Sequence, residues 1–249
     1  MRLDKELVIR KLVSSRQRSV FLIKKGKVKV NGVVCNIVSH LTLPSDYIEL
    51  TEADMKWVGR GALKLVAAIE HWKPVIQQKI CLDVGASTGG FTQVLLEHGA
   101  LKVYAIDTGY GQLADVIKND KRVINLEKTN AKDLTSKLVP DKIDVCVIDV
   151  SFISVLKVLP AILQLLKKEA TLIVLIKPQF ESGKEFLDKK GIVRNQKVRE
   201  MVVSGVLDDM KKMGIDNIEL VDSPITGGDG NKEYLASGKY IGTFSRSNS

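Results

Sequence analysis

Short apolar segments alternate with helix-forming segments over most of this chain, and this alternation limits the folds that it can adopt. Five segments are typical of strands buried on both faces: residues 80–84, 102–107, 123–126, 145–149 and 171–176. Continuous apolar strands between helices predict a mostly parallel sheet with helices on both faces, which is an α/β fold. Ligands bind such sheets outside the carboxyl ends of the strands. The polar residues at these ends are Asp83, Asp107, Asp149 and Lys177.

A glycine-rich turn follows the first of these strands and covers residues 83–91, DVGASTGGF. Ser87 stands where a dinucleotide fingerprint has its second glycine, and the Gly-Lys-Ser/Thr of a P-loop is absent. The pattern D-x-G-x-x-x-G-G resembles instead the S-adenosylmethionine loop of class I methyltransferases, whose small residues let the backbone approach the ligand. Asp107, at the end of the next strand, is placed to accept hydrogen bonds from ribose hydroxyls. Without Asp107, a simple strand-to-helix connection would explain the turn equally well.

Four charged residues are candidates for the chemistry. Lys177 directly follows the fifth apolar strand and Asp149 ends the fourth, while Lys64 precedes the first strand and Glu233 lies in a late turn. A ribose 2′-hydroxyl needs a base or a polarising partner to attack a sulfonium methyl group, and a lysine serves when burial or a neighbouring cation keeps it neutral. Each residue also has an ordinary interpretation, as a surface lysine, a strand-end cap or a solvated turn. Sequence spacing alone does not bring the four together.

Positive charge is concentrated at the N-terminal end. The net charge is +9, and residues 1–40, with ten basic and two acidic side chains, carry +8 of it. Apolar residues recur in this stretch at helical and strand spacing, and Asn31-Gly32 marks a hairpin turn, so we expect a small folded unit of two helices and a hairpin. A compact basic unit is typical of nucleic-acid binding, although a solvated basic surface has the same composition. The candidate RNA-binding residues are Arg2, Arg10, Lys11, Arg16, Arg18, Lys24, Lys25, Lys27, Lys29 and, further along, Arg60.

Two resemblances follow from these motifs. Arg2-Leu3-Asp4, Ser15-Arg16 and residues 23–32 resemble the RNA-binding domain named after ribosomal protein S-four, a kind of domain that grips structured RNA by shape and backbone. Six further motifs resemble, in order, the TlyA family, and they cover residues 59–65, 85–92, 109–114, 149–154, 177–181 and 230–234. That family joins an S-four type domain to an FtsJ-type methyltransferase domain. The resemblance implies a class I methyltransferase fold at residues 59–249, a small α+β RNA-binding domain at 1–54 and a linker at 55–58.

The TlyA resemblance also implies an activity, the 2′-O-methylation of cytidines in bacterial ribosomal RNA with S-adenosylmethionine. The catalytic lysine, aspartate, lysine and glutamate of FtsJ-type enzymes fall on Lys64, Asp149, Lys177 and Glu233. Lys177 would be the base or activator of the 2′-hydroxyl, and Asp149 would orient Lys177 and the substrate. Lys64 and Glu233 would position the ribose and tune Lys177. The chain stops soon after Gly242, which predicts the shorter family type and large-subunit (23S) RNA as the substrate, with 16S RNA as a second target. The expected cofactor-binding residues are Asp83, Gly85, Ser87, Thr88, Gly89, Gly90, Phe91, Asp107 and Asn130.

The remaining features limit the alternatives. No apolar segment reaches the roughly 18 uncharged residues of a membrane span, and the charged N-terminus lacks the apolar core of a signal peptide. The three cysteines and three histidines show no metal-ligand spacing. We therefore expect a soluble cytoplasmic protein that binds ribosomal RNA or ribosomal subunits, with no metal and no membrane partner. Because some members of the TlyA family are named hemolysins, a membrane-active protein is one alternative, and an RNA-binding protein with an inactive methyltransferase fold is another.

Overall fold

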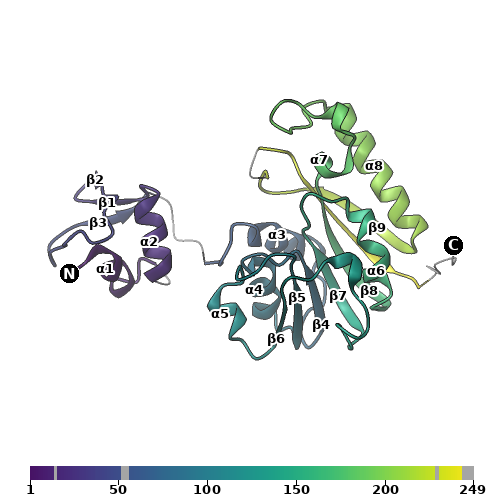
Figure 1. Cartoon of the computed structure of the whole chain (residues 1–249), viewed down its shortest axis with the longest axis horizontal. Helices are drawn as coiled ribbons and strands as arrows, with labels where there is room; N and C mark the ends of the chain where they lie inside the picture. Colours follow the sequence, from purple (N-terminus) through teal and green to yellow (C-terminus); the bar gives the residue numbers. More distant parts are fainter. Residues whose placement is uncertain (14–15, 52–55, 228–229, 243–249) are drawn as a thin grey trace. The chain divides into compact units, whose positions relative to one another are not determined.

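The structure of the chain, a computed structural model, describes residues 1–13, 16–51, 56–227 and 230–242. Ser15 of the S-four-like motif, and Asp54 and Met55 at the predicted domain boundary, lie outside these ranges. The chain divides into two compact units, residues 1–56 and residues 57–249 (Figure 1). Trp57 and Val58, which we expected in a linker, pack against the core of the second unit.

The first unit contains two helices and a small antiparallel sheet. Asn31 and Gly32 have left-handed backbone angles, φ 52° and 81°, as the favoured two-residue hairpin turn requires. The two helices share one core with the sheet, in which Leu3, Leu7 and Ile23 are fully buried. The regularly spaced apolar residues therefore face the core, as expected. A third strand, β3, was not predicted. The elements are α1 (Leu3–Ile9), α2 (Arg16–Lys24), β1 (Val28–Val30), β2 (Val33–Val34) and β3 (Ile48–Leu50), with strand order β2-β1-β3.

The second unit is a seven-stranded sheet with helices on both faces (Figure 1). Its strand order is β6-β5-β4-β7-β8-β10-β9, and the first five of these strands are parallel, which confirms the predicted α/β fold. The helices are α3 (Ala62–Trp72), α4 (Gly90–Glu97), α5 (Asp115–Lys118), α6 (Leu159–Leu163), α7 (Pro178–Glu181) and α8 (Gln196–Lys212), with 3-10 turns η1 (Ala131–Asp133), η2 (Val155–Lys157) and η3 (Lys184–Phe186). The strands are β4 (Ile80–Val84), β5 (Lys102–Ile106), β6 (Val123–Leu126), β7 (Ile143–Ile148), β8 (Leu166–Ile176), β9 (Ile215–Asp222) and β10 (Tyr234–Tyr240).

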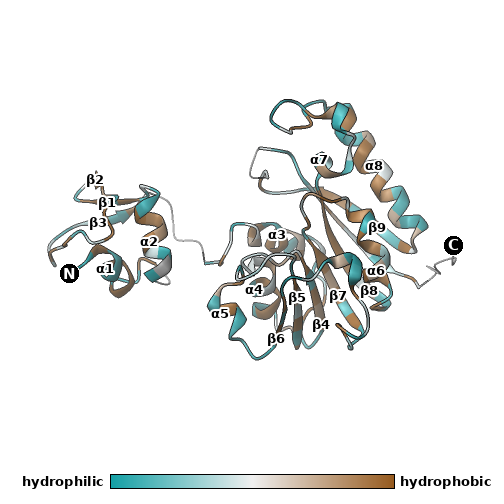
Figure 2. Ribbon diagram, viewed as in Figure 1, coloured by the Kyte–Doolittle hydropathy of each residue, from teal (hydrophilic) through white to brown (hydrophobic). Residues whose placement is uncertain are grey.

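Side chains along each central strand enter the two faces of the sheet alternately. In β4, Leu82 and Val84 belong to a core cluster shared with α6 and α8, whereas Cys81 belongs to a cluster shared with α3 and α4. Figure 2 shows these strands mostly in the hydrophobic colour. Because both faces are covered, the strands need apolar residues at every position, and this explains their continuous apolar runs.

The part of the sheet formed by β8, β10 and β9 differs from the prediction. β8 begins at Leu166 instead of residue 171, and β10 runs antiparallel between β8 and β9. Neither β9 nor β10 was predicted. The outer strand, β9, has mostly half-exposed and exposed residues, and β10 contains Ser237, Gly238 and Lys239 in its second half, so neither has the apolar run of a central strand.

The order of the strands opens a crevice at one edge of the sheet. From β4 the chain moves outward to β5 and β6, and it then returns to β7 on the other side of β4. Connections that leave two neighbouring strands in opposite directions leave space at their carboxyl ends, where open α/β sheets bind ligands. Asp107, Asp149 and Lys177 directly follow β5, β7 and β8 at this edge.

Candidate functional site

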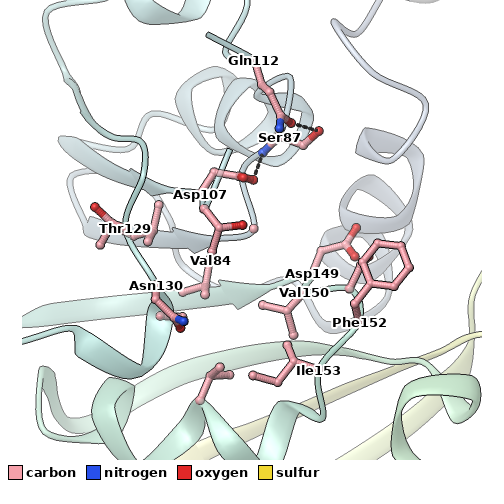
Figure 3. A pocket seen from close by; sticks show the side chains of 16 residues that line it. Val84, Ser87, Asp107, Gln112, Thr129, Asn130, Asp149, Val150, Phe152 and Ile153 are labelled. Atoms are coloured by element: carbon pink, nitrogen blue, oxygen red, sulfur yellow. Dashed lines mark hydrogen bonds between the residues drawn. The ribbon is translucent and has the colours of Figure 1, made fainter. Parts of the chain in front are cut away.

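The carboxyl ends of β4, β5 and β7 surround a cavity of about 460 Å³, which we call the first cavity (Figure 3). Polar side chains gather on one part of its wall, among them Ser87, Asp107 and Gln112. Apolar side chains such as Ile106 and Ile153 form another part. The wall is made by Val84, Gly85, Ser87, Ile106, Asp107, Thr108, Gln112, Thr129, Asn130, Ala131, Asp149, Val150, Ser151, Phe152, Ile153 and Val158.

The glycine-rich turn needs glycine where other chain segments approach it. Gly85 has φ +89°, and a Cβ atom there would overlap the carbonyl oxygen of Asp149. Gly89 has φ +92°, and its Cβ would lie 2.8 Å from a side-chain carbon of Leu113. The turn therefore brings bare backbone to the wall of the first cavity, between the ends of β4 and β7.

Asp107 connects the glycine-rich turn to the loop of residues 109–114. Its Oδ2 accepts a hydrogen bond from the backbone N–H of Ser87 at 2.7 Å, and its Oδ1 accepts one from Gly109 at 2.7 Å. The Ser87 hydroxyl in turn donates to Gln112 Oε1 at 3.3 Å, as Figure 3 shows. Each carboxylate oxygen has a second acceptor position, so Asp107 is able to receive hydroxyl donors from the cavity as well.

The residues of the first cavity fit S-adenosylmethionine by their chemistry. The Asp107 carboxylate at the end of β5 is an acceptor suited to a ribose diol. Ile106, Val150 and Ile153 provide apolar surface suited to a flat purine ring. Gly85 presents bare backbone to the cavity, because a Cβ atom at this position would overlap the backbone of Asp149. No residue of the wall conflicts with a ligand of this kind.

The predicted cofactor-binding residues are divided by the structure into two groups. Gly85, Ser87, Asp107 and Asn130 line the first cavity. The sequence analysis missed Gln112, Thr129, Val150 and Ile153, although Gln112, Val150 and Ile153 lie in motifs that it had quoted. The others do not line this cavity: Phe91 is buried in the core cluster of α3 and α4, and Asp83, Thr88, Gly89 and Gly90 are also absent from its wall.

Asp83 lies in β4, fully buried beneath the glycine-rich turn. Its Oδ2 accepts a hydrogen bond from the Thr92 hydroxyl at 2.6 Å, which joins β4 to the first turn of α4. Its Oδ1 has no hydrogen-bond partner among the described residues. Burial raises the pKa of Asp83 to about 7, the Thr92 hydroxyl opposes this rise, and the negative charge of Asp149 adds to it.

The four candidate catalytic residues come together at the carboxyl edge of the sheet. Lys177 Nζ lies 2.5 Å from Asp149 Oδ1, Lys64 Nζ lies 3.7 Å from Asp149 Oδ2, and Lys64 Nζ lies 2.7 Å from Glu233 Oε2. The cluster thus runs Lys177–Asp149–Lys64–Glu233 with alternating charge. Both lysines and Glu233 are buried, and Asp149 is half-buried. Buried charges persist only when they are paired, and here two positive and two negative groups balance.

Four elements that are distant in the chain supply these side chains. Lys64 lies in the first turn of α3, which packs by its apolar face beside α4, and Glu233 directly precedes β10. β10 pairs with β8 so that Tyr234 lies opposite Ile176, and this register brings Glu233 next to Lys177 in the sheet. Asp149 and Lys177 lie beside each other because β7 and β8 are parallel neighbours.

A second cavity, of about 380 Å³, lies on the other side of the charged cluster. Lys64, Lys177 and Glu233 line this second cavity, whereas Asp149 lines the first. Ser151 and Phe152 line both, so the two cavities meet at the cluster. The arrangement places a buried lysine and its carboxylate partner between two ligand-sized spaces. The wall of the second cavity is formed by Arg60, Gly61, Lys64, Ser151, Phe152, Lys177, Gln179, Phe180, Leu187, Lys190, Gly191, Ile225, Thr226, Gly227, Asn231 and Glu233.

The loop after β7 is braced by α7. Glu181 Oε1 accepts the backbone N–H of Val155 at 2.8 Å, and burial raises the pKa of Glu181 while hydrogen bonds from Ser154 and Val155 oppose the rise. The Phe152 ring, 91% exposed, lies 5.1 Å from the Phe180 ring between centroids. The residues that follow Asp149 and those that follow Lys177 therefore hold the two turns together.

The candidate RNA-binding residues of the first unit have different environments. Arg10 pairs with Glu6 at 2.8 Å and donates to the carbonyl oxygens of Leu43, Pro44 and Asp46, so its guanidinium stabilises a loop of the unit itself. Arg2 and Arg16 pair with the buried Asp4; burial raises the pKa of Asp4, but these guanidiniums hold it below its usual value. Lys29 lies 3.3 Å from Glu49, and Arg18 lies over the Phe21 ring.

The other candidates of this group are more open. Lys11, Lys24 and Lys25 are exposed and Lys27 is half-exposed. Arg60 belongs to the second unit, where it lines the second cavity and donates to the carbonyl oxygen of Thr226 at 3.3 Å. The RNA-binding role of the whole group stays a prediction.

Two features of the described residues bear on the alternatives. Within the described ranges, no helix is both long and apolar enough to cross a membrane. The same ranges contain no group of three or more histidine, cysteine or acidic side chains with metal-binding geometry. All three cysteines are free, and Cys81 and Cys146 are buried.

Comparisons with known proteins agree with this architecture. Residues 57–240 match the family of FtsJ-like methyltransferases, and residues 1–48 match the S4 domain. The chain is 43% identical over 237 residues to the 16S/23S rRNA (cytidine-2′-O)-methyltransferase TlyA of Mycobacterium tuberculosis, covering 94% of this chain and 88% of that protein. It is 35% identical over 249 residues to the 23S rRNA (cytidine-2′-O)-methyltransferase TlyA of Campylobacter jejuni, covering 92% and 95%. A protein of Streptococcus thermophilus, solved under the name hemolysin, has a TM-score of 0.75 and 33% identity, covering 97% of this chain and 88% of that one.

Proposed function

The chain belongs to the TlyA family of FtsJ-like methyltransferases with an S4 domain, and from this premise we propose that it transfers a methyl group from S-adenosylmethionine to the 2′-oxygen of cytidine ribose in ribosomal RNA. The large-subunit (23S) RNA is the first expected substrate, because both TlyA relatives carry 23S rRNA in their names. The 16S RNA is the second, as in the name of the Mycobacterium tuberculosis protein.

One observation carries the proposal: the Lys177–Asp149–Lys64–Glu233 cluster lies where two cavities meet. A methyltransferase needs the donor and the acceptor on opposite sides of its catalytic groups. The first cavity is lined by residues whose chemistry suits S-adenosylmethionine. The second cavity is lined by Lys64 and Lys177 and also by Arg60 and Lys190, whose charges suit an RNA backbone. Methylation at oxygen also needs a group to take the hydroxyl proton, and Lys177 lies at the junction.

In this reaction the chain supplies positioning and proton transfer. S-adenosylmethionine, when bound, supplies a methyl group on a positively charged sulfur, which becomes neutral as the methyl group leaves. Asp107 and the glycine-rich turn hold the donor in the first cavity. Transfer requires Lys177 to have released its own proton first, and Nζ then accepts the 2′-hydroxyl proton as the oxygen bonds to the methyl carbon. Asp149 then pairs with the ammonium that forms on Lys177. Lys64, which Glu233 holds in place, also pairs with Asp149 and offsets part of its negative charge.

Transfer of labelled methyl groups to ribosomal subunits tests this function. Separated large and small subunits from a strain that lacks the gene would be incubated with labelled S-adenosylmethionine. We expect label in large-subunit RNA, at a nucleotide that resists alkaline cleavage, which is the signature of a methylated 2′-oxygen. Label in protein, or in RNA at an alkali-sensitive position, would contradict the proposal. Binding of donor and RNA without any label would favour the inactive RNA-binding alternative.

Two lysines of the same strand region serve as variant and control. Lys177→Ala removes the proton acceptor after the carboxyl end of β8, and we expect a loss of transfer by about 10²-fold or more with cofactor binding retained. Lys168→Ala changes an exposed residue near the other end of β8 and should leave the rate unchanged. A Lys177→Ala protein that binds cofactor and methylates at the wild-type rate would refute the assigned role.

A further inference from the structure

Ser151 is a polar contact of Lys177 for which the family resemblance assigned no role. Lys177 Nζ donates a hydrogen bond to Ser151 Oγ at 2.8 Å. Ser151 lies two residues after Asp149 in the same loop, its side chain is exposed, and it lines both cavities. Ser151 therefore contacts Lys177 at the place where the methyl donor and the RNA acceptor would meet.

The hydrogen bond to Ser151 restricts the orientation of the Lys177 amine. A neutral amine has two hydrogens and one lone pair. Ser151 Oγ at 2.8 Å accepts one hydrogen of the Lys177 amine. Asp149 Oδ1, 2.5 Å from Nζ, forms an ion pair with Lys177 but has no hydrogen-bond partner among the described residues. The hydrogen bond to Ser151 fixes the rotation about the Cε–Nζ bond, so that the lone pair is held to the remaining positions of the amine. Without Ser151, no hydrogen bond among the described residues sets this rotation, and the lone pair has no fixed direction.

The loop holds Ser151 in place from both sides. Gly85 packs against the carbonyl of Asp149, so that this end of the loop is fixed at the glycine-rich turn. Phe152 has a left-handed backbone, φ 64°, which turns the chain sharply directly after Ser151. Beyond it, Glu181 binds the backbone N–H of Val155. Strain at a non-glycine residue of this kind persists only where the surroundings enforce it.

We propose that Ser151 is a positioning residue that directs the lone pair of neutral Lys177 toward the 2′-hydroxyl of the substrate. The inference rests on the proposed function. In the step itself, the 2′-hydroxyl proton passes to Nζ, the 2′-oxygen bonds to the methyl carbon, and the carbon–sulfur bonding pair stays on the donor sulfur. Ser151 exchanges no proton in this step. Its oxygen accepts the same N–H before and after the transfer.

Three variants of this loop test the proposal by single-turnover methylation of large-subunit RNA. Ser151→Ala removes the acceptor, and we expect the rate at saturating donor and RNA to fall by about tenfold or more, since loss of alignment alone costs up to about 10²-fold. The affinities for S-adenosylmethionine and RNA should not change. Ser151→Thr keeps a hydroxyl and should recover most of the rate. Ser154→Ala, which removes the cap of η2 in the same loop, is the control for general loosening of the loop.

The pattern of rates decides between direction of Lys177 and a structural role. An Ala variant as fast as wild type overturns the proposal. So does a loss of rate in Ser154→Ala equal to that in Ser151→Ala, because the effect would then belong to the loop and not to the hydroxyl. A loss in Ser151→Ala that Ser151→Thr does not restore would equally count against a role for the hydroxyl.

A second measurement separates this inference from the proposed function. In the intact protein with nitrogen-15 labelled lysine, the Nζ signal of Lys177 is identified as the one lost in Lys177→Arg. We expect Ser151→Ala to shift this signal and to speed its hydrogen exchange, while Ser151→Thr and Ser154→Ala leave it near the wild-type position. An unchanged signal in Ser151→Ala overturns the inference. A wild-type protein that methylates no RNA overturns the proposed function, and the Nζ signal still decides whether Ser151 orders Lys177.

Discussion

At the scale of single residues, the charged cluster depends on pairing inside the protein. Glu233 is almost fully buried and its Oε2 lies 2.7 Å from Lys64 Nζ. Lys64 has a second, longer contact with Asp149 at 3.7 Å. Breaking a buried ion pair by removing one partner leaves an uncompensated charge, so the remaining groups must move or lose their charge. The short contact identifies Glu233 as the group that holds Lys64 in position.

Replacing Glu233 by glutamine tests this dependence. Glu233→Gln keeps the size of the side chain but removes its charge, so that Lys64 is drawn toward Asp149 and weakens the contact of Asp149 with Lys177. We expect methyl transfer to slow by about tenfold or more. Cofactor affinity measured by calorimetry should stay the same, because Glu233 lines the second cavity and not the first. Glu70→Gln, at an exposed position of the same helix as Lys64, is the control. A rise in the cofactor dissociation constant that accounts for the whole loss would contradict this account.

Asp83 predicts a pH dependence of stability. Its pKa is raised by burial to about 7 in the folded protein, from a reference value of 3.8. Between these values the folded state holds a proton that the unfolded state has released, so the contribution of Asp83 to stability is full below pH 4 and falls as pH rises toward 7. The slope is at most about 1.4 kcal/mol per pH unit.

An asparagine at this position does not titrate. We therefore expect the free energy of unfolding of Asp83→Asn, measured by denaturant titration, to rise relative to that of the wild type between pH 4 and 7. Above pH 7 the difference between the two free energies should stay constant. Asp133→Asn, at an exposed position, should show no such trend. A difference that is the same at pH 5 and pH 8 would show that Asp83 does not titrate in this range.

At the scale of elements, the loop of residues 109–114 closes one side of the first cavity, and the Glu127 carboxylate holds the backbone of its second half. Glu127 Oε1 accepts the backbone N–H of Gln112 at 2.9 Å and of Leu113 at 3.3 Å, and Gly111 also donates to this carboxylate. Burial alone would raise the pKa of Glu127, but these backbone donors hold it below its ordinary value. Gln112 lines the cavity, so Glu127 positions a part of the wall that it does not itself form.

Removal of this carboxylate should weaken cofactor binding. We expect Glu127→Ala to raise the dissociation constant for S-adenosylmethionine several-fold, because the backbone N–H groups of the loop lose their acceptor, with little change in the rate at saturating donor. Glu127→Gln should have a smaller effect, since its amide oxygen still accepts. Because the pKa is lowered, the carboxylate stays ionised and the effect should be constant between pH 6 and 8. Calorimetry measures the affinity, and Glu200→Ala on α8 is the exposed control. Equal affinities of wild type and Glu127→Ala would exclude the role.

At the scale of the whole molecule, the positive charge is concentrated in the first 40 residues, and the rest of the chain is nearly neutral. Residues 1–40 carry +8 of the net charge of +9. The Arg10 guanidinium donates hydrogen bonds to carbonyl oxygens of the first unit itself. The adjacent pair Lys24 and Lys25 at the end of α2 is exposed. The exposed lysines are therefore better candidates for phosphate contacts than Arg10 is.

Lys24→Ala/Lys25→Ala should weaken RNA binding through charge alone. We expect a several-fold loss of affinity for large-subunit RNA at physiological salt, and a slope of log K against log salt that is reduced by about one to two, as expected for two lost phosphate contacts. Cofactor affinity should not change. Lys211→Ala/Lys212→Ala, an adjacent pair at the end of α8, is the matched control. Filter binding across a salt series measures both slopes, and equal slopes for the two double variants would contradict the assignment.

Sequence patterns were sufficient to predict the fold class, the concentration of positive charge near the N-terminus and the identity of the charged candidates. These properties are encoded locally. A strand covered on both faces needs an apolar residue at each position, a hairpin of the observed twist needs Asn31-Gly32, and the approach of Asp149 to Gly85 excludes any side chain there. Local patterns of this kind are visible without knowledge of the strand order. The role of the four candidates came from a family resemblance and not from their spacing.

Which of these residues meet depends on the tertiary fold. Lys64 and Glu233 are neighbours because β10, which the sequence analysis did not recognise, enters the sheet antiparallel to β8. Asp83, expected at the cofactor, does not line the first cavity, since side chains in β4 alternate between faces and Val84 takes the position at the cavity. Ser151 became a candidate once the parallel register of β7 and β8 set its hydroxyl beside Lys177. Strand order and register fix such contacts, and both depend on the packing of the whole sheet and not on any one segment.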